Sequence, residues 1–391
     1  MAKIGIIISS LYACGGEERV VSLMANEWVK QHEVTIFTFE NREHEGNQNN
    51  YYLSEQIKVF RVDNPKLSFL GKIIKLLYYY IGIPSDKLFP KLLRKVLYPN
   101  AFFKEWEDRI NTGKFDIMIG ISGTYSVLLG AIKDKVSAKL IGWQHSSYEG
   151  YFDAKKGYYR NQESFFAKSL AKLDACIVLN RDIQAKYKRH LGLETKVISN
   201  PKSFVSKYKA DVNQHCFVTC GRVEAEKGYD DLIEAFCKFN KYNNDWKLLI
   251  IGGGSLKEQL ELKIEKNNIG DKAVITGYIH NVSEFLLQGS IFIMTSRWEG
   301  FPMSITEALE IGLPIIAYGI PAMEPLVTDG KEGRIVPAFD NDAMVDAMKE
   351  LASDVEKRQQ MSDAAVKKAM ALTPENIAQD WFRLFDELSG G

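Results

Sequence analysis

The sequence lacks the features that mark several large protein classes. Its five cysteines are scattered without a Cys-x-x-Cys pair, so neither a disulfide framework nor a zinc site is expected. It has no run of about 18 apolar residues, and its apolar start is too short for a secretion signal. Basic and acidic residues balance at 50 each, which leaves no net field to attract nucleic acid. We therefore expect a cytoplasmic protein that neither crosses a membrane nor binds nucleic acid.

Alternating short apolar runs and helix-length segments fill the chain. Its 391 residues exceed what one hydrophobic core usually supports, so two domains are expected. Strands are predicted at 3–9, 33–39, 57–62, 115–120, 139–143, 174–179 and 196–199, then at 216–221, 247–252, 273–277, 291–296, 314–318 and 333–336. Buried strands that alternate with helices indicate parallel sheets covered on both faces. The predicted fold class is α/β, with two Rossmann-like, doubly wound domains.

The domain boundaries follow from changes in this pattern. A polar stretch over residues 200–214 separates the two series of strands. Near the end, Thr373, Pro374 and Glu375 form a typical helix start, and the helix after them carries a broad apolar face. We expect one domain over residues 1–200, a second over 201–373, and a helix over 374–391 that packs back toward the first domain.

The first candidate site follows the first predicted strand. In open parallel sheets, ligands bind beyond the carboxyl ends of the strands, where helix N-termini present free N–H groups. Gly15 and Gly16 lie there, and adjacent glycines let the backbone approach a phosphate or a sugar closely. A flexible turn with no ligand is the alternative.

A second candidate opens the second domain. Gly221 and Arg222 follow a predicted strand, and Lys227 comes five residues after the arginine. Arginine offers a planar fork to phosphate oxygens and lysine a compact charge, so the pair could hold a nucleotide diphosphate. Solvated surface charge is the alternative reading.

A third candidate surrounds Glu299, at the end of another predicted strand. Pro302 is expected at the first helical position, which leaves Met303 and Ser304 as the N–H donors to an anion. Glu307 falls in the second helical turn. Two carboxylates also suggest a glycoside hydrolase, but such an enzyme needs no diphosphate clamp. In a purely structural reading, Glu299 serves the helix dipole and Glu307 is a surface residue.

Together these segments resemble the retaining glycosyltransferases of family four, which have the GT-B fold. The similarity covers nearly the whole chain. Five segments are similar to motifs of the family. The motif GG-x-E-R is similar to Gly15-Gly16-Glu17-Glu18-Arg19, V-I-x-N-P to Val197-Ile198-Ser199-Asn200-Pro201, and G-R-x-x-x-x-K-G to Gly221-Arg222 with Lys227-Gly228. The motif E-x7-E is similar to Glu299 with Glu307, and E-G-F-G to Glu299-Gly300-Phe301-Pro302. One departure is Gly252-Gly253-Gly254-Ser255, which is similar to the family's G-x-G but lacks an acidic residue between the glycines.

The resemblance implies roles for individual residues in two domains that face each other across a cleft. Arg222 and Lys227 would hold the donor diphosphate. Glu299 would contact the transferred sugar, and His145 would face it, although a lone histidine can also be structural. The donor site would consist of Gly15, Gly16, Asn200, Gly221, Tyr278, Ile279, Gly300, Phe301, Met303, Ser304 and Glu307, with the base near Tyr278 and Ile279 and the ribose at Glu307.

The resemblance also implies an activity. The enzyme would move a hexose or N-acetylhexosamine, with retention, from a nucleotide-diphosphate sugar, expected to be a UDP-sugar. The acceptor would be a hydroxyl of a glycan or lipid-linked glycan in bacterial surface polysaccharide synthesis. No metal and no further cofactor are expected. A GT-B-like nucleotide-sugar epimerase or phosphorylase remains an alternative, as does a catalytically silent paralogue that serves as a binding or scaffold partner.

Residues 64–104 have an unusual composition. They contain eight basic residues and eight aromatics against one acid, Asp86. Leu67, Leu70, Ile73, Ile74, Leu77 and Ile81 form an apolar stripe beside lysines. Such a helix can lie on an anionic lipid surface, which would place the protein at the inner face of the cell membrane. The alternative is a core helix with a solvated basic face.

Overall fold

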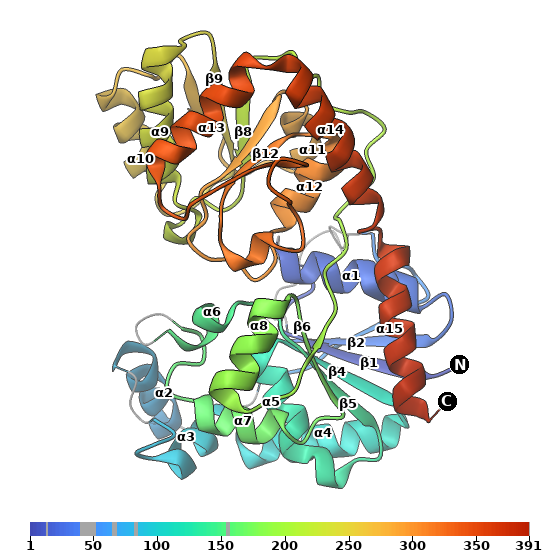
Figure 1. The fold of residues 1–391 in the computed structure, drawn as a ribbon. Coiled ribbons are helices and arrows are strands. Elements are labelled where there is room, and N and C mark those ends of the chain that lie inside the picture. Colours follow the sequence, from blue (N-terminus) through green and yellow to red (C-terminus); the bar gives the residue numbers. More distant parts are fainter. Residues whose placement is uncertain (13–14, 40–51, 65–68, 82–84, 154–156, 391) are drawn as a thin grey trace. The chain divides into compact units, whose positions relative to one another are not determined.

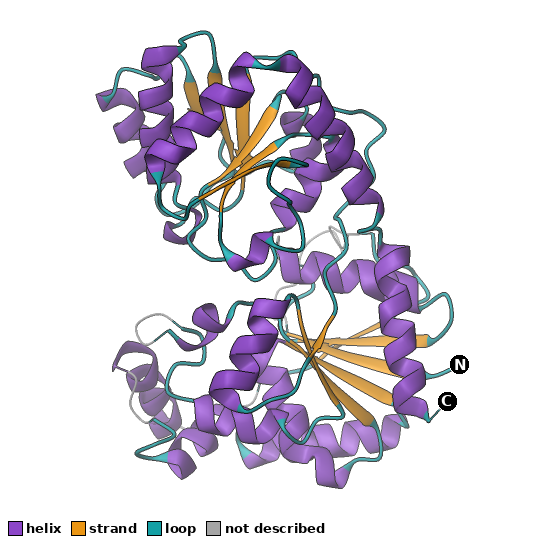
Figure 2. Ribbon diagram, viewed as in Figure 1, coloured by secondary structure: helices purple, strands orange, loops and turns teal. Residues whose placement is uncertain are grey.

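The computed structural model describes residues 1–12, 15–39, 52–64, 69–81, 85–153 and 157–390 (Figure 1). The chain forms two compact units. Residues 1–200 and 374–391 make up the N-terminal unit, and residues 201–373 make up the C-terminal unit. In each unit, helices cover both faces of a central sheet (Figure 2).

The sheet of the N-terminal unit is parallel throughout, with seven strands among the described residues in the order β3-β2-β1-β4-β5-β6-β7. The strands are β1 (Lys3–Ile8), β2 (Glu33–Thr38), β3 (Lys58–Arg61), β4 (Ile117–Ile121), β5 (Lys139–Trp143), β6 (Ala175–Val178) and β7 (Lys196–Val197). The order reverses between β1 and β4, and ligands bind at such switch points in doubly wound sheets.

Helices surround this sheet because its strands are apolar on both faces; Ile6, Ile7 and Ile119 are fully buried. The helices are α1 (Gly16–Trp28), α2 (Phe69–Ile81), α3 (Pro90–Leu97), α4 (Asn100–Gly113), α5 (Ser122–Ile132), α6 (Tyr148–Phe152), α7 (Glu163–Leu170), α8 (Arg181–Lys186) and α15 (Pro374–Ser389), with short helical turns at Lys133–Lys135 and Tyr187–Leu191.

The last helix, α15, belongs to the N-terminal unit. Its Trp381 is fully buried, and the ring centroid lies 5.0 Å from that of Trp28 in α1 and 4.6 Å from that of Trp143 in β5. Both contacts are edge-to-face, a favourable geometry for aromatic rings. The apolar face seen in the sequence thus finds its partner surface on α1 and β5.

The sheet of the C-terminal unit repeats this topology, with six strands among the described residues in the order β10-β9-β8-β11-β12-β13. The strands are β8 (Cys216–Cys220), β9 (Lys247–Ile251), β10 (Ala273–Ile275), β11 (Ile291–Met294), β12 (Ile315–Tyr318) and β13 (Gly333–Val336). The helices are α9 (Tyr229–Tyr242), α10 (Lys257–Lys266), α11 (Val282–Leu286), α12 (Met303–Ile311), α13 (Asn341–Ser353) and α14 (Val355–Met370), with short turns at Ala225–Lys227 and Pro321–Met323. Here the order reverses between β8 and β11.

The predicted fold class is confirmed, and each predicted strand is present with ends that agree within two residues. One local prediction is wrong. Pro302 was expected at the first helical position, but its ψ of 99° is extended, so it caps α12 and the helix begins at Met303.

The apolar stripe of α2 lies on the surface of the unit. Leu70, Ile73, Leu77 and Ile81 are exposed, so the alternative of a stripe buried in the core is wrong for these residues. Leu67 lies outside the described residues. No helix in the described part of the chain combines the length and the apolar character that spanning a membrane requires.

Candidate active site

The loop after β8 starts at a close approach between two backbone segments. A Cβ atom on Gly252, whose φ is 144°, would lie only 2.0 Å from the carbonyl oxygen of Gly221. The Val223 N–H donates to the Gly253 carbonyl at 2.9 Å. The glycine segment after β9 therefore supports the Gly221 loop through its backbone, which only glycine permits at Gly252.

At the switch point of this unit, Lys227 and Glu299 form an ion pair. Lys227 Nζ lies 2.6 Å from Glu299 Oε1, and the side chains are only 15% and 14% exposed. Ser296 Oγ donates to the same carboxylate oxygen at 2.8 Å. A carboxylate and an ammonium are thus held next to each other at the carboxyl ends of β8 and β11.

Further contacts hold the two loops together. Arg297 donates from Nη2 to both carboxylate oxygens of Asp230, at 2.9 and 2.8 Å, and its backbone N–H donates to the Glu226 carbonyl at 2.7 Å. A Cβ atom on Gly228, whose φ is 62°, would lie 2.3 Å from the Thr295 carbonyl oxygen. These contacts therefore link the loop of Lys227 to the loop of Glu299.

Arg222 lies on the same loop but outside this ion pair. Its side chain is 63% exposed, and Nη2 lies 2.9 Å from Glu226 Oε1. The sequence analysis missed Glu226 as a partner for the predicted clamp. A diphosphate that bound Arg222 would have to compete with this carboxylate, which is an exposed and therefore weak contact.

The start of α12 lies directly after the Glu299 turn. Met303 and Ser304 occupy its first two positions, where the helix dipole favours an anion. Phe301 is buried beside them. Glu307, one turn further along, is also buried, and its Oε2 lies 3.5 Å from Cys220 Sγ at the end of β8.

The predicted base-binding residues lie after β10. Tyr278 is 77% exposed, and Ile279 beside it is partly exposed. A Cβ atom on Gly253 would lie 2.8 Å from the Tyr278 ring, so this ring borders the glycine segment that supports the Gly221 loop. An exposed aromatic ring at this edge of the sheet offers a surface on which a base could stack.

The remaining predicted residues belong to the N-terminal unit. Gly15 caps α1 and Gly16 begins it, while Asn200 is buried after β7. His145 follows β5; its ring centroid lies 4.5 Å from that of Trp143, and its backbone N–H donates to Tyr151 Oη at 3.3 Å. Burial lowers the pKa of His145 to about 3, so the ring is neutral at physiological pH.

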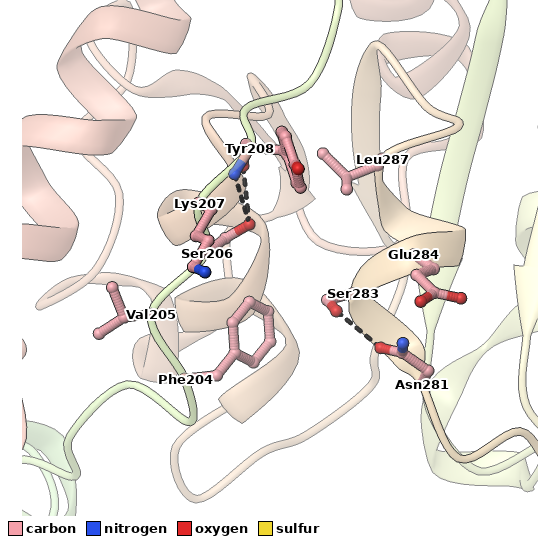
Figure 3. A pocket seen from close by; sticks show the side chains of 9 residues that line it. All are labelled: Phe204, Val205, Ser206, Lys207, Tyr208, Asn281, Ser283, Glu284 and Leu287. Atoms are coloured by element: carbon pink, nitrogen blue, oxygen red, sulfur yellow. Dashed lines mark hydrogen bonds between the residues drawn. The ribbon is translucent and has the colours of Figure 1, made fainter.

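The described residues contain no cluster of three or more His, Cys, Asp or Glu side chains with the arrangement of a metal site. A pocket of about 290 Å³ lies between residues 204–208 and α11 (Figure 3). It is lined by Phe204 and Tyr208 on one side and Asn281 and Leu287 on the other. None of the predicted site residues lines it.

Comparison with protein families identifies the chain. The model named Glycosyl transferases group 1 matches residues 202–368, and the model named Glycosyltransferase Family 4 matches residues 14–201. This chain belongs to glycosyltransferase family 4. The resemblance found in the sequence motifs is confirmed, and the protein is a glycosyltransferase.

Relatives of this glycosyltransferase extend over its full length. It is 25% identical over 99% of both chains to a Campylobacter jejuni enzyme named GalNAc-alpha-(1->4)-GalNAc-alpha-(1->3)-diNAcBac-PP-undecaprenol alpha-1,4-N-acetyl-D-galactosaminyltransferase. A lipopolysaccharide core mannosyltransferase of Rhizobium meliloti is 32% identical over 41% of this chain and 47% of its own.

Solved structures share the GT-B architecture. Sucrose-phosphate synthase from Thermosynechococcus elongatus superimposes with a TM-score of 0.79 at 18% identity, over all of both chains. HepE of Anabaena in complex with UDP gives a TM-score of 0.76 at 15% identity, over 98% of this chain and 100% of its own. At such identities the likeness supports the fold alone.

Proposed function

We propose that this glycosyltransferase moves a hexose or N-acetylhexosamine from a UDP-sugar to a hydroxyl of a glycan or lipid-linked glycan, with retention, in bacterial surface polysaccharide synthesis. The full-length relative from Campylobacter jejuni has an undecaprenol-linked glycan in its name. HepE, which shares the fold, was solved with UDP. The residues of this chain supply the chemistry that such a transfer needs.

The proposal depends mainly on the ion pair between Lys227 and Glu299. A donor diphosphate would replace the Glu299 carboxylate as the ion-pair partner of the Lys227 ammonium. Glu299 would then be free to accept hydrogen bonds from the hydroxyls of the transferred sugar. Arg222 and the start of α12 at Met303 would add positive charge where the leaving group becomes more negative. These groups would do the work that a divalent ion does in other transferases.

A transfer with retention at the anomeric carbon requires little acid–base catalysis by side chains. The bond between the anomeric carbon and the phosphate oxygen breaks, and a bond to the acceptor oxygen forms on the same face of the sugar. The acceptor proton passes to the departing phosphate oxygen. Glu299 therefore orients the sugar and stabilises positive charge near the anomeric carbon, and no side chain needs to act as a general base.

Replacement of Arg222 by alanine should weaken the binding of UDP about tenfold, because one charge-assisted contact to phosphate is lost from an exposed position. Isothermal titration measures this. Lys238→Ala is the matched control, since Lys238 is an exposed cation of α9 that pairs with Asp342. Equal UDP affinities in the wild type and Arg222→Ala would remove Arg222 from the clamp.

Product analysis separates transfer from the alternatives. An epimerase would change the sugar of the nucleotide sugar without an acceptor, and a phosphorylase would depend on free phosphate. A silent paralogue would bind a nucleotide sugar without releasing nucleotide. Transfer predicts nucleotide release that rises when a glycan acceptor is added.

We also propose that α2 and α3 dock the enzyme on an anionic lipid surface. Large exposed apolar side chains gather on these helices and the segment between them: Phe69, Leu70, Ile73, Leu76, Leu77, Tyr80, Ile81, Leu88, Phe89 and Leu92. Lys72, Lys87, Lys91, Arg94 and Lys95 are exposed beside them. Asp86, the acid of this stretch, is buried and accepts bonds from Ser164 N–H at 2.6 Å and Phe165 N–H at 3.1 Å. The exposed charge of this surface is therefore positive, which complements anionic lipid.

Flotation with vesicles should show binding to anionic phosphatidylglycerol at low salt and much less at high salt, because each cation contributes about 1 kcal/mol near such a surface. Leu76→Asp should reduce flotation. Leu262→Asp is the matched control, since Leu262 of α10 is 65% exposed and Leu76 is 58% exposed. Absence of flotation at low salt, or an equal effect of both substitutions, would contradict the proposal.

A further inference from the structure

The switch point of the N-terminal sheet holds a half-buried carboxyl group that the transfer step described above does not use. Glu17 lies in the first turn of α1, and Ser122 directly follows β4 as the first residue of α5. The Ser122 hydroxyl donates a hydrogen bond to Glu17 Oε2. The two side chains thus meet where β1 and β4 diverge, which is the ligand-binding position of a doubly wound sheet.

Ser122 is held in a conformation that serine rarely adopts. Its φ is 60°, in the left-handed region, which costs a non-glycine residue about 1 kcal/mol or more. Neighbours enforce it: Ser126 Oγ donates to the Ser122 carbonyl at 2.7 Å, and Gln144 Nε2 donates to Ser126 Oγ at 2.7 Å. Such strain is typical of a residue whose side chain has to be presented in one direction.

The surroundings of Glu17 are aromatic. Tyr125, Tyr151 and Tyr159 are buried, and burial raises the pKa of each. The charge of the nearby Glu17 adds a smaller rise to all three pKa values. Burial raises the pKa of Glu17 itself to about 7, the Ser122 bond opposes this, and the nearby Glu18 adds to it. Among the described residues no lysine or arginine forms an ion pair with Glu17, so its carboxylate has a hydroxyl partner and no cationic one.

We propose that Glu17 and Ser122 bind two neighbouring hydroxyls of the acceptor sugar and so position the hydroxyl that receives the transferred sugar. This inference rests on the proposed function. A carboxylate can accept hydrogen bonds from both hydroxyls of a diol, and a neutral diol satisfies it without adding charge to a half-buried site. A phosphate or uronate at the same position would place a second negative charge beside Glu17. The subsite therefore takes a neutral sugar.

The backbone of His145 borders the same cluster. Tyr151 Oη accepts a bond from the His145 backbone N–H; burial raises the pKa of Tyr151, and a hydrogen bond with Ser122 opposes this. The Nε2 atom of His145 is buried and has no hydrogen-bond partner in the described part of the chain. The elements after β1, β4 and β5 thus bring the Glu17 carboxylate and the hydroxyls of Ser122 and Tyr151 together, and all three groups can bind hydroxyls.

The test measures the KM for neutral octyl glycosides with the UDP-sugar that the enzyme turns over. Glu17→Gln should raise this KM at least tenfold at about pH 8, while hydrolysis of the UDP-sugar without acceptor falls much less. Ser122→Gly should raise it less, because glycine fits the left-handed backbone and only the hydroxyl is lost. Glu27→Gln is the matched control, since Glu27 lies in the last turns of α1 and pairs with Lys30 at 2.7 Å.

A pH profile gives a second readout. The wild-type KM for the glycoside should rise as pH falls from about 8 to about 6, because the carboxylate accepts hydrogen bonds more strongly than the acid. Glu17→Gln should abolish this dependence. The facing tyrosines stay protonated in this range because their pKa values are raised, and His145 stays neutral. Glu18 also faces Glu17, and Glu18→Gln should leave the dependence in place.

The outcomes distinguish this proposal from the proposed function. An active Glu17→Gln enzyme with a wild-type KM, or with the wild-type pH dependence, overturns the subsite and leaves glycosyl transfer intact. A wild-type protein that turns over no nucleotide sugar overturns the proposed function. In that case saturation-transfer NMR with octyl glucoside decides: binding to the wild type that is lost in Glu17→Gln supports the subsite, and equal binding or none contradicts it.

Discussion

Glu299→Gln should lower the rate of glycosyl transfer by about 100-fold to 1,000-fold, the usual cost of removing one preorganised group that stabilises transition-state charge. The amide keeps the shape of the side chain and can still accept a bond from Ser296 Oγ, which donates to Glu299 Oε1 at 2.8 Å. It cannot stabilise positive charge at the anomeric carbon. Nucleotide release with acceptor present, measured at saturating donor, gives the loss in kcat.

The same variant should bind UDP at least as tightly as the wild type. In the wild type the Lys227 ammonium has to leave the Glu299 carboxylate, 2.6 Å away, before it can bind phosphate. With glutamine at this position that competition is removed. Glu356→Gln, at an exposed acid of α14, serves as the control for both measurements. Wild-type turnover in Glu299→Gln, or lost UDP binding, would show that Glu299 has another role.

Glu17→Gln should stabilise the protein above neutral pH. The pKa of Glu17 rises from 4.5 in the unfolded chain to about 7 in the folded protein, so folding favours the neutral acid. Stability from this group is complete below about pH 4.5 and is lost as pH rises through about 7. A shift of this size corresponds to about 3 kcal/mol, and partial access of water reduces the expected gain of the variant to about 2 kcal/mol.

Urea unfolding at two pH values tests this expectation. The free energy of unfolding of Glu17→Gln should exceed that of the wild type at about pH 8 and approach it at about pH 5. Glu27→Gln should show no such pH-dependent gain, because Lys30 pairs with Glu27. A glutamine variant that is less stable than the wild type at about pH 8 would show that the Glu17 carboxylate does not destabilise the folded protein. Retention of a destabilising group is expected where function requires it.

The sequence predicted the sheets well because their strands are buried on both faces. Runs such as Ile4 to Ile8 and Ile291 to Met294 are continuously apolar, and a turn with glycine or a polar residue follows each. Two chemically distinctive loops, those of Lys227 and Glu299, were placed at the carboxyl ends of β8 and β11 by this pattern. Their direct contact could not be predicted, since 72 residues separate them in the chain.

Other features depended on contacts that no local pattern reveals. Glu17 stands at the variable position of the GG-x-E-R segment, and its partner Ser122 is 105 residues away. In the sequence, Arg297 cannot be told from an ordinary surface cation, because its partner Asp230 is 67 residues away. Pro302 was placed one residue too far into α12, because proline suits both the cap and the first helical position, and only the backbone ψ separates the two.

The two units use one topology for different chemistry. At the β8–β11 switch point, two cations and a helix start offer positive charge, which suits a diphosphate. At the β1–β4 switch point, a half-buried carboxyl group lies among tyrosines and forms no ion pair with a described lysine or arginine, which is the basis for proposing a neutral sugar there. The difference lies in a few side chains at the strand ends, on sheets that share the same order over six strands.

The central claim is that the β8–β11 switch point binds a nucleotide diphosphate through Lys227. Thermal unfolding in the presence of a panel of nucleotide sugars tests it most directly, because a ligand that binds only the folded state raises the melting temperature. We predict that at least one UDP-sugar raises the melting temperature of the wild type and leaves that of Lys227→Met unchanged. If no nucleotide sugar raises it, or if the rise persists in Lys227→Met, the claim is contradicted.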